Sequence, residues 1–409
     1  MFNELENLNP WWENRDFRHK LVSRHLYLKA LSSEHNKLIK VLIGGRRTGK
    51  TFLLKSQINA LLDQGIKPSN ILYITTESIV VLKKDLLEIL NQVLARIRPD
   101  RRQKIYIFFD EIQEIPGWQT IIKYIYDNFK VQIYLSGSSS LILKAETSKL
   151  TGRFRIIEVL PLSFEEYLTF TGKSTATRKA FEAYLATGGY PEYVKRKDIS
   201  ILRNIVESTL YRDLLSLYGI RNPRLLSDLL DYLVEKTGTP VSPYRIKTDL
   251  KVDDGTARFY LQYLEDVYLI YPLYRFSRSH RITKSSNPKY YLNDTGIITT
   301  RSLNPQIGLL AENAFYLHLR RQLNSLEHKK LYYYIENDIE VDFFNAHDST
   351  FYEIKFRNDI DSGDFEKLYS IQNGKKIQLL LKDKKNCGNL LTEYPEITVQ
   401  ELYKVMKGE

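Results

Sequence analysis

Short apolar runs alternate with amphipathic segments between Leu38 and about Glu158. Four of the runs, LIKVLIGG, ILYITTES, IYIFFDE and QIYLSGSS, are apolar on both faces rather than alternating with polar residues. Strands of this kind belong to parallel sheets whose two faces are both covered, and the helical patterns between them supply the cover. This part of the chain therefore predicts an α/β fold.

Beyond this region the strand signals fade. Residues 177–217 have a helical pattern that is interrupted by TGGYP at 187–191, which indicates a helical lid or connector. Three closely spaced helices follow, LLSDLLDYLVEKT, SPYRIKTDL and DGTARFYLQYLEDVYLI, and then a strand-like basic stretch at 271–294. This order is typical of a winged helix-turn-helix.

The C-terminal part returns to a mixed pattern. A connector at 301–308 leads into a helix from about Leu309 and two strands near 331–344 and 351–357. The chain is thus expected to hold five parts. These are an N-terminal helical segment (1–36), an α/β core (37–172), a helical lid or connector (173–221), a winged helix-turn-helix (222–300) and a C-terminal α/β domain (301–409).

A glycine-rich loop follows the first strand. Gly44–Thr51 reads GGRRTGKT and matches G-x4-G-K-[S/T] between an apolar strand and a helix, a context that a chance glycine turn would lack. Its backbone N–H groups would curl around phosphates at a helix N-terminus, with Lys50 on the β/γ oxygens and the Thr51 hydroxyl on Mg²⁺. The residues expected to contact ATP are Gly44, Gly45, Arg46, Arg47, Thr48, Gly49, Lys50, Thr51 and Phe52.

The strand IYIFFDE supplies the acidic half of such a site. Asp110 is expected to hold the Mg²⁺ hydration shell, and Glu111 to polarise the attacking water; a pair of surface carboxylates is the alternative. The strand Ile71–Thr75 lies in sequence between the glycine loop and this strand, which favours the additional-strand division of P-loop folds.

Two further groups are candidates for catalysis. The strand QIYLSG ends in hydroxyls, so Ser136 or Ser138 is a candidate for sensing the γ-phosphate or fixing the lytic water, although serines after strands are also ordinary turn formers. Arg153 in LTGRF is a candidate transition-state arginine, acting in its own subunit or across a subunit interface.

Five motifs in this order resemble a known family: GGRRTGKT, FFDEIQEI, LSGSSSLILKAETSKLTGRFRIIEVLPLSFEEYL, TGGYPEYV and NPKYYLNDTG. The resemblance, over about residues 20–360, is to prokaryotic AAA-like P-loop ATPases whose C-terminal part is called domain of unknown function 4143. It implies a nucleotide-binding domain, a winged helix and a C-terminal domain similar to the restriction-endonuclease fold.

The formal charge of +11 favours a polyanionic partner, with DNA expected, because Lys and Arg displace the counterions condensed on nucleic acid. A generally basic solvated surface is the alternative. Residues 275–289 hold five basic residues and no acid, as a basic wing would. The residues expected to bind nucleic acid are Arg258, Arg275, Arg278, Arg281 and Lys284.

The third helix of the winged-helix pattern is the expected recognition helix. Asp254 is expected to cap it. The apolar positions expected to face the core are Phe259, Leu261, Leu264 and Leu269. Thr256, Arg258 and Gln262 lie on the opposite face and suit phosphate or base-edge contacts. The alternative is that this winged helix is a packing module within an ATPase.

An acidic cluster is expected in the C-terminal part. Glu312, Asp342 and the pair Glu353 and Lys355 follow the order E…D…ExK, which resembles the core of PD-(D/E)xK nucleases. Carboxylates on neighbouring strands would share Mg²⁺, and Lys355 would orient or deprotonate the attacking water. Alternating charge on an amphipathic strand is the ordinary explanation of ExK. The histidines show no ligand spacing, so no zinc site is expected.

Several classes are disfavoured by composition. No apolar run approaches the roughly 20 residues of a membrane span, and the first residues lack the pattern of a secretory signal, so a cytoplasmic protein is expected. The leading hypothesis is an ATP-hydrolysing machine that engages nucleic acid. The alternative is a nucleotide-dependent interaction or signalling switch, with slow hydrolysis and no cleavage, that acts on a protein partner or as a homo-oligomer.

Overall fold

The computed structural model describes residues 2–32, 38–76, 85–100, 102–137, 150, 152–220, 222–323, 330–371, 376–387 and 389–408. The chain divides into two compact units, Met1–Val159 and Leu160–Glu409, each with its own five-stranded sheet. No helix among these residues has both the length and the apolar character that crossing a bilayer requires.

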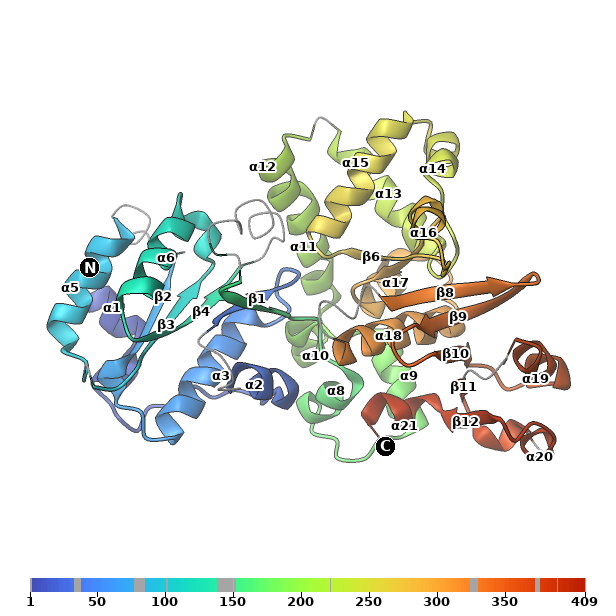
Figure 1. Ribbon diagram of the computed structural model, residues 1–409, viewed down its shortest axis with the longest axis horizontal. Coiled ribbons are helices and arrows are strands. Elements are labelled where there is room, and N and C mark those ends of the chain that lie inside the picture. Colours follow the sequence, from blue (N-terminus) through green and yellow to red (C-terminus); the bar gives the residue numbers. More distant parts are fainter. Residues whose placement is uncertain are drawn as a thin grey trace. The chain divides into compact units, whose positions relative to one another are not determined.

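The sheet of the first unit is wholly parallel, with strand order β2-β3-β4-β1-β5 (Figure 1). Its strands are β1 (Ile39–Ile43), β2 (Ile71–Thr75), β3 (Ile105–Asp110), β4 (Val131–Ser136) and β5 (Phe154–Glu158). The four predicted strands are confirmed. The fifth, β5, escaped prediction because it is an edge strand whose Arg155 and Ile156 side chains are exposed, which weakens its apolar pattern.

Helices cover both faces of this sheet, as the apolar strands require. The helical elements are α1 (Phe2–Leu8), η1 (Pro10–Trp12), α2 (His25–Ser32), α3 (Lys50–Asp63), η2 (Pro68–Asn70), α5 (Leu86–Ile97), η3 (Ile112–Glu114) and α6 (Trp118–Asn128). Side chains of α5 and α6 pack on one face of the sheet, and those of α2 and α3 pack on the other (Figure 1). This is the layered α/β arrangement predicted from the sequence.

The second unit begins with helices and a short strand pair. Its helices are α8 (Phe164–Phe170), α9 (Arg178–Thr187), α10 (Pro191–Arg196), α11 (Ile199–Ser208), the π-helical turn η5 (Thr209–Asp213), α12 (Leu214–Tyr218), α13 (Pro223–Glu235), α14 (Pro243–Leu250), α15 (Asp254–Asp266), α16 (His280–Ser285) and α17 (Thr295–Arg301). The antiparallel pair is β6 (Ile270–Leu273) with β7 (Lys289–Leu292).

Three local expectations for this region need correction. The basic stretch predicted to be strand-like holds the helix α16 between β6 and β7. Asp253, not Asp254, caps α15, and its carboxylate accepts the Thr256 N–H at 2.8 Å. Phe259 was expected in the core but is 62% exposed, because the buried stripe of α15 runs instead through Ala257, Leu261 and Leu264.

The motifs TGGYP and NDTG meet inside the second unit. Both oxygens of the buried Asp294 carboxylate accept main-chain N–H groups, from Gly189 at 2.6 Å and from Gly296 at 2.9 Å. Gly188 has φ +77°, and a Cβ there would clash with the Asp294 carboxylate. Burial raises the Asp294 pKa to about 7, although its hydrogen bonds to the two amides oppose the rise. These glycines are therefore required by close packing.

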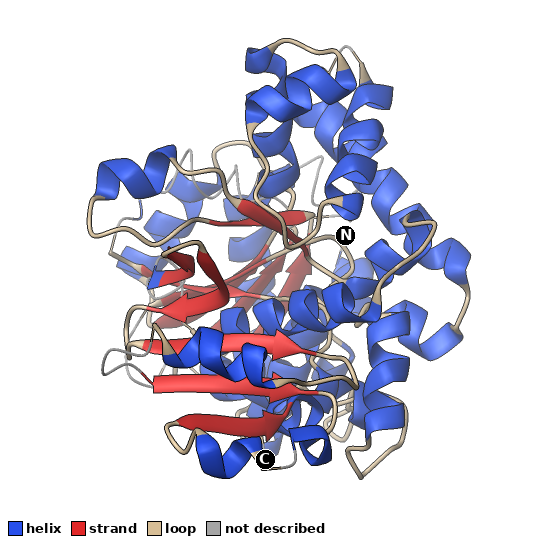
Figure 2. Ribbon diagram, turned by 90° about the vertical axis from the view of Figure 1, so that its right-hand side faces the viewer, coloured by secondary structure: helices blue, strands red, loops and turns tan. Residues whose placement is uncertain are grey.

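The C-terminal sheet is mixed and has the order β12-β11-β10-β9-β8 (Figure 2). Its strands are β8 (Leu331–Glu336), β9 (Ile339–Asn345), β10 (Thr350–Lys355), β11 (Lys376–Leu381) and β12 (Ile397–Glu401). The first predicted strand is really two, β8 and β9, joined by a tight turn in which Asn337 and Asp338 both have positive φ. The remaining helical elements are α18 (Ile307–Gln322), α19 (Ser362–Tyr369), η7 (Lys384–Cys387), α20 (Leu390–Glu393) and α21 (Leu402–Lys407).

Candidate nucleotide site and a second acidic cluster

The glycine loop joins the carboxyl end of β1 to the start of α3, as predicted. Gly44 has φ +139°, and a Cβ there would clash with the Val159 carbonyl, so the main chain passes β5 closely. The Lys50 ammonium is buried and donates to the carbonyl oxygens of Gly44 at 3.1 Å and Gly45 at 2.9 Å. The loop is therefore curled around its own lysine at the N-terminus of a 14-residue helix.

An arginine supports the loop from outside the motif. The Thr48 hydroxyl donates to the Gly45 carbonyl at 3.0 Å, and the buried Arg24 guanidinium donates to the Thr48 carbonyl at 2.8 Å. The same guanidinium lies 4.5 Å from the centre of the Tyr27 ring. Sequence reasoning missed Arg24, since no local motif marks a residue that acts 24 positions before its partner.

The remaining predicted residues are more exposed, and they lie in the glycine loop and in the first turn of α3. Arg47 is exposed with φ +57°, Arg46 and Thr51 are partly exposed, and Phe52 is 61% exposed. Phe52 therefore presents an exposed aromatic ring beside the loop.

The acidic strand meets the loop strand through β4. Ser136, the last residue of β4, is in register with Leu42 of β1 and hydrogen-bonds with its hydroxyl to Asp110 at the end of β3. The other Asp110 oxygen accepts the Tyr73 hydroxyl at 2.7 Å. Asp110 is buried, and these two donors to its carboxylate are neutral hydroxyls. Tyr73 was missed because an aromatic residue in an apolar strand reads as core.

Glu111 is held just beyond the strand in a left-handed conformation, φ +56°. Its carboxylate accepts the Gln113 amide at 2.6 Å, and its N–H donates to the Ser136 hydroxyl at 3.1 Å. Ser136 thus touches both predicted acidic residues. Ser138, the other hydroxyl predicted for this role, lies outside the described residues.

Arg153 does not lie at the phosphate loop of its own chain, which corrects the expectation of a role within one subunit. Its carbonyl accepts the N–H of Ile39, the first residue of β1, whereas the loop follows the last residue of that strand. Its guanidinium lies 3.7 Å from Asp127 and over the Tyr126 ring at the end of α6. Arg153 therefore occupies the opposite edge of the sheet, and a role across a subunit interface stays a prediction.

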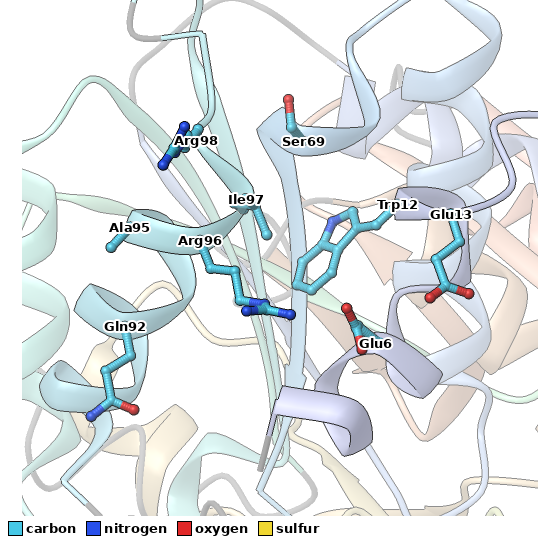
Figure 3. Close-up of a pocket in the computed structure, with 9 residues that line it drawn as sticks. All are labelled: Glu6, Trp12, Glu13, Ser69, Gln92, Ala95, Arg96, Ile97 and Arg98. Atoms are coloured by element: carbon cyan, nitrogen blue, oxygen red, sulfur yellow. The ribbon is translucent and has the colours of Figure 1, made fainter.

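A pocket of about 740 Å³ opens at that opposite edge (Figure 3). It lies between η1, η2 and the end of α5, and Trp12, Arg96 and Glu6 point toward one another in it. The Trp12 indole donates to the carbonyl of Ile71, the first residue of β2, at 2.9 Å. Because it opens at the start of the strands, this pocket is separate from the phosphate loop.

The second unit brings the four predicted nuclease residues together. The Asp342 and Glu353 carboxylates each accept a main-chain N–H group from the other strand of the β9–β10 pair. The Asp342 N–H donates to the Glu353 carboxylate at 3.2 Å, and the Ile354 N–H donates to the Asp342 carboxylate at 2.8 Å. The Lys355 ammonium lies 2.7 Å from Glu353. Glu312 on α18 joins them electrostatically, since its charge raises the pKa of Asp342 further, after burial and Glu353.

Glu340 of β9, which was not predicted, and two residues of β7 complete this acidic cluster, which consists of Glu312, Glu340, Asp342, Glu353, Lys355, Lys289 and Tyr291. Lys289 and Tyr291 were not predicted for it, although they belong to the motif NPKYYLND. Among the described residues no group of three or more Asp, Glu, His or Cys side chains is arranged to hold a metal ion. The predicted residues therefore converge, but not as a set of metal ligands.

The residues predicted to bind nucleic acid divide into two groups. Arg258 pairs with Asp254 one helical turn away at 2.7 Å, and Arg275 donates to the Ile335 carbonyl at 3.2 Å. Arg278, Arg281 and Lys284 are exposed and, within the described part of the chain, make no ion pair. Only the side chains of the second group are exposed and, among the described residues, without an ion pair.

Two family descriptions match parts of the chain. Residues 36–168 match the AAA domain, and residues 178–306 match a domain of unknown function, DUF8612. The first match and the loop geometry place an AAA-type nucleotide-binding domain in the first unit. The domain of unknown function 4143, inferred from the motifs, stays unconfirmed, because the matching C-terminal description is a different one.

Curated relatives extend over most of the chain. An uncharacterised protein of Haemophilus influenzae is 28% identical and covers 87% of this chain and 92% of its own length. One of Methanocaldococcus jannaschii is 29% identical over 79% of this chain and 75% of its own length.

Solved structures give looser matches. DnaA of Aquifex aeolicus with bound AMPPCP is 16% identical, with a TM-score of 0.32, and covers 63% of this chain and 92% of its own. Hsp104 of S. cerevisiae in complex with casein is 15% identical at the same TM-score and covers 66% and 54%. At this TM-score neither overlay fixes which residues correspond.

Proposed function

We propose that the first unit binds ATP with Mg²⁺ and hydrolyses it. The observation that supports this most is the placing of Lys50. Its buried ammonium lies on the carbonyls of the glycine loop, at the sheet edge where β3 ends in Asp110. Backbone N–H groups at a helix start, a lysine and a nearby carboxylate are the parts that phosphoryl transfer from a nucleotide requires.

The roles follow from the contacts. Lys50 would exchange its carbonyl partners for the β- and γ-phosphate oxygens, while loop N–H groups donate to the same phosphates. Thr51 and Asp110 are the residues that would hold Mg²⁺, which supplies positive charge beside the phosphates when bound. Glu111 would accept a proton from the attacking water, and Ser136 keeps Asp110 and Glu111 in fixed relation.

Titration with ATP and Mg²⁺, followed by phosphate release, tests this function in wild type and Lys50→Ala. The substitution removes the charge that faces the γ-phosphate, so we expect turnover to fall by about 10²–10³-fold, the range for removing one group that stabilises the transition state. Lys123→Ala, at a side chain on α6 that is 44% exposed, is the matched control and should be unchanged. Undiminished binding and turnover in Lys50→Ala would overturn the proposal.

A second candidate function is contact with nucleic acid through the basic α16 segment, residues 275–286. We infer that α13–α15 with β6 and β7 form a winged-helix arrangement in which α16 stands in for the wing. No residue of α16 is buried, and no acid occurs between Asp266 and Asp294. Phosphate contacts need exposed cations that are not already paired, and Arg278, Arg281 and Lys284 meet that need within the described residues.

Binding of a labelled DNA duplex at several salt concentrations tests this interaction. Replacing Arg278, Arg281 and Lys284 together by Gln should weaken binding and lower the salt slope by roughly 0.9 for each phosphate that is no longer neutralised. Gln at the exposed Arg15, Lys20 and Lys29 is the matched control. If DNA neither binds nor alters ATP turnover, the alternative remains: a nucleotide-dependent switch that acts on a protein partner or as a homo-oligomer.

A further inference from the structure

We propose that the Lys289 ammonium takes the place, in the acidic cluster of the second unit, of the divalent cation that a PD-(D/E)xK nuclease would bind there. The cluster is then a metal-free ion-pair centre that fastens β7 to the C-terminal sheet. This inference concerns the second unit alone and does not depend on ATP hydrolysis by the first.

Lys289 is built into the cluster rather than lying near it. It is the first residue of β7 and only 1% exposed. Its ammonium is 2.7 Å from a Glu340 oxygen and 3.7 Å from a Glu312 oxygen, so one cation bridges β9 and α18. Pro240 bridges to Lys289 on one side and Leu273 of β6 pairs with it, which fixes the main chain that presents the ammonium.

Protein donors other than Lys289 also contact the Glu312 and Glu353 carboxylates. The Tyr291 hydroxyl donates to Glu312 at 2.7 Å, on the same oxygen that faces Lys289. Glu353 receives two ammonium groups on one oxygen, Lys355 at 2.7 Å and Lys367 at 3.1 Å. Metal ligands need lone pairs directed at one shared point, whereas the oxygens of Glu312, Glu340 and Glu353 named above face protein donors.

The charges of the cluster nearly balance without a metal. Five carboxylates face four cations: the carboxylates are Glu312, Glu340, Asp342, Glu353 and Asp364, and the cations are Lys289, Lys355, Lys367 and Arg357. Burial, with Glu353 and Glu312 close by, raises the Asp342 pKa well above its usual range. A divalent cation would add two positive charges beside a lysine that cannot leave for water.

The residues present therefore do not fit the metal that the nuclease resemblance implies, and no cleavage step follows from them. The centre instead connects three elements that are distant in sequence. Lys289 is the first residue of β7, so its ion pairs with Glu312 and Glu340 hold the start of this strand, which follows the α16 segment, against α18 and β9. The motif NPKYYLND is explained by these ion pairs, with its lysine and second tyrosine facing the carboxylates.

Mn²⁺ titration of the nucleotide-free full chain, followed by electron paramagnetic resonance, tests the inference. Wild type should bind no Mn²⁺ that depends on Asp342 or Glu353. Lys289→Met keeps the length and apolar body of the side chain but removes its charge, so it should gain one Mn²⁺ per chain. Lys289→Arg, which keeps the charge, should not gain it, and Lys289→Met with Asp342→Asn should lose it.

Two outcomes would overturn the inference. One is Mn²⁺ binding in wild type that disappears in Asp342→Asn or Glu353→Gln, because the lysine would then not fill the site. The other is a folded Lys289→Met protein that binds no additional Mn²⁺. If Lys289→Met does not fold, the comparison of wild type with Asp342→Asn still decides: equal Mn²⁺ binding supports the inference and a difference overturns it.

Discussion

The phosphate loop of the first unit and the acidic cluster of the second both place lysines near carboxylates, but they use them in opposite ways. In the first, Lys50 lies on main-chain carbonyls and Asp110 accepts hydroxyls from Tyr73 and Ser136. In the second, ammonium groups face the carboxylates directly, as Lys289 faces Glu340. The contacts described for the first arrangement are with main-chain carbonyls and hydroxyls, whereas those of the second are ion pairs between lysines and carboxylates.

The physical reason is the cost of burying charge. A carboxylate or ammonium removed from water must find a partner or change its protonation state. Among the described residues, Asp110 accepts two neutral hydroxyls and forms no ion pair with a lysine or arginine. In the acidic cluster, by contrast, the Lys289 ammonium of β7 supplies the positive charge, so no bound metal ion is needed.

The largest expected effect is the loss of ATP turnover when Glu111 is replaced. Glu111→Gln keeps the size of the side chain and its hydrogen bond with Gln113 but cannot accept a proton. We expect nucleotide binding to persist and turnover to fall by about 10²–10⁴-fold, the range for losing a general base. Glu114→Gln, three residues on and exposed, should keep full turnover. Equal loss in both variants would remove Glu111 from the mechanism.

The carboxylate of Asp294 is held neither by hydroxyls, as Asp110 is, nor by ammonium groups, as the acidic cluster is. Asp294 is buried and held by two main-chain amides, and its pKa is raised to about 7. A raised carboxyl pKa means that the folded state favours the protonated form of Asp294. The contribution of this side chain to stability is therefore full below about pH 4 and is lost as pH rises through about 7.

Thermal unfolding at about pH 5 and about pH 8, on either side of the window that this pKa shift defines, measures the effect. The melting temperature of wild type relative to Asp294→Asn should be higher at the lower pH, because Asn does not ionise. Asp198 is the control: hydrogen bonds from Ser200 lower its pKa, so its contribution to stability is already full at both pH values and removing it should cost the same at each. A difference for Asp294 that is the same at both pH values would contradict the assignment.

The smallest expected effect concerns a single hydroxyl in the acidic cluster. Tyr291→Phe removes the hydrogen bond to Glu312 and leaves the Lys289 ion pair in place. We expect a loss of about 1.5–3 kcal/mol in the free energy of unfolding, the range for a hydrogen bond to a charged group. Tyr290→Phe, at the neighbouring position of the same strand, is the matched control. Equal losses would show that the Tyr291 hydroxyl does not support the cluster.

Local pattern was enough for much of the fold. The four central strands of the first sheet and the helices α13, α14, α15 and α18 lie where apolar periodicity predicted them. The pattern failed where context overrides it: at the edge strand β5, at the tight turn between β8 and β9, and at α16, whose short basic sequence has no apolar face.

The sequence by itself determined the phosphate loop, because strand, loop and helix are consecutive and the loop's chemistry is contained within Gly44–Thr51. It also predicted three of the four carboxylates of the acidic cluster, Glu312, Asp342 and Glu353, but not Glu340. Only the tertiary structure decided what faces them. Arg24, Tyr73 and Lys289 are separated from their partners by 24, 37 and 23 or more residues, and no local periodicity encodes an interaction across such distances.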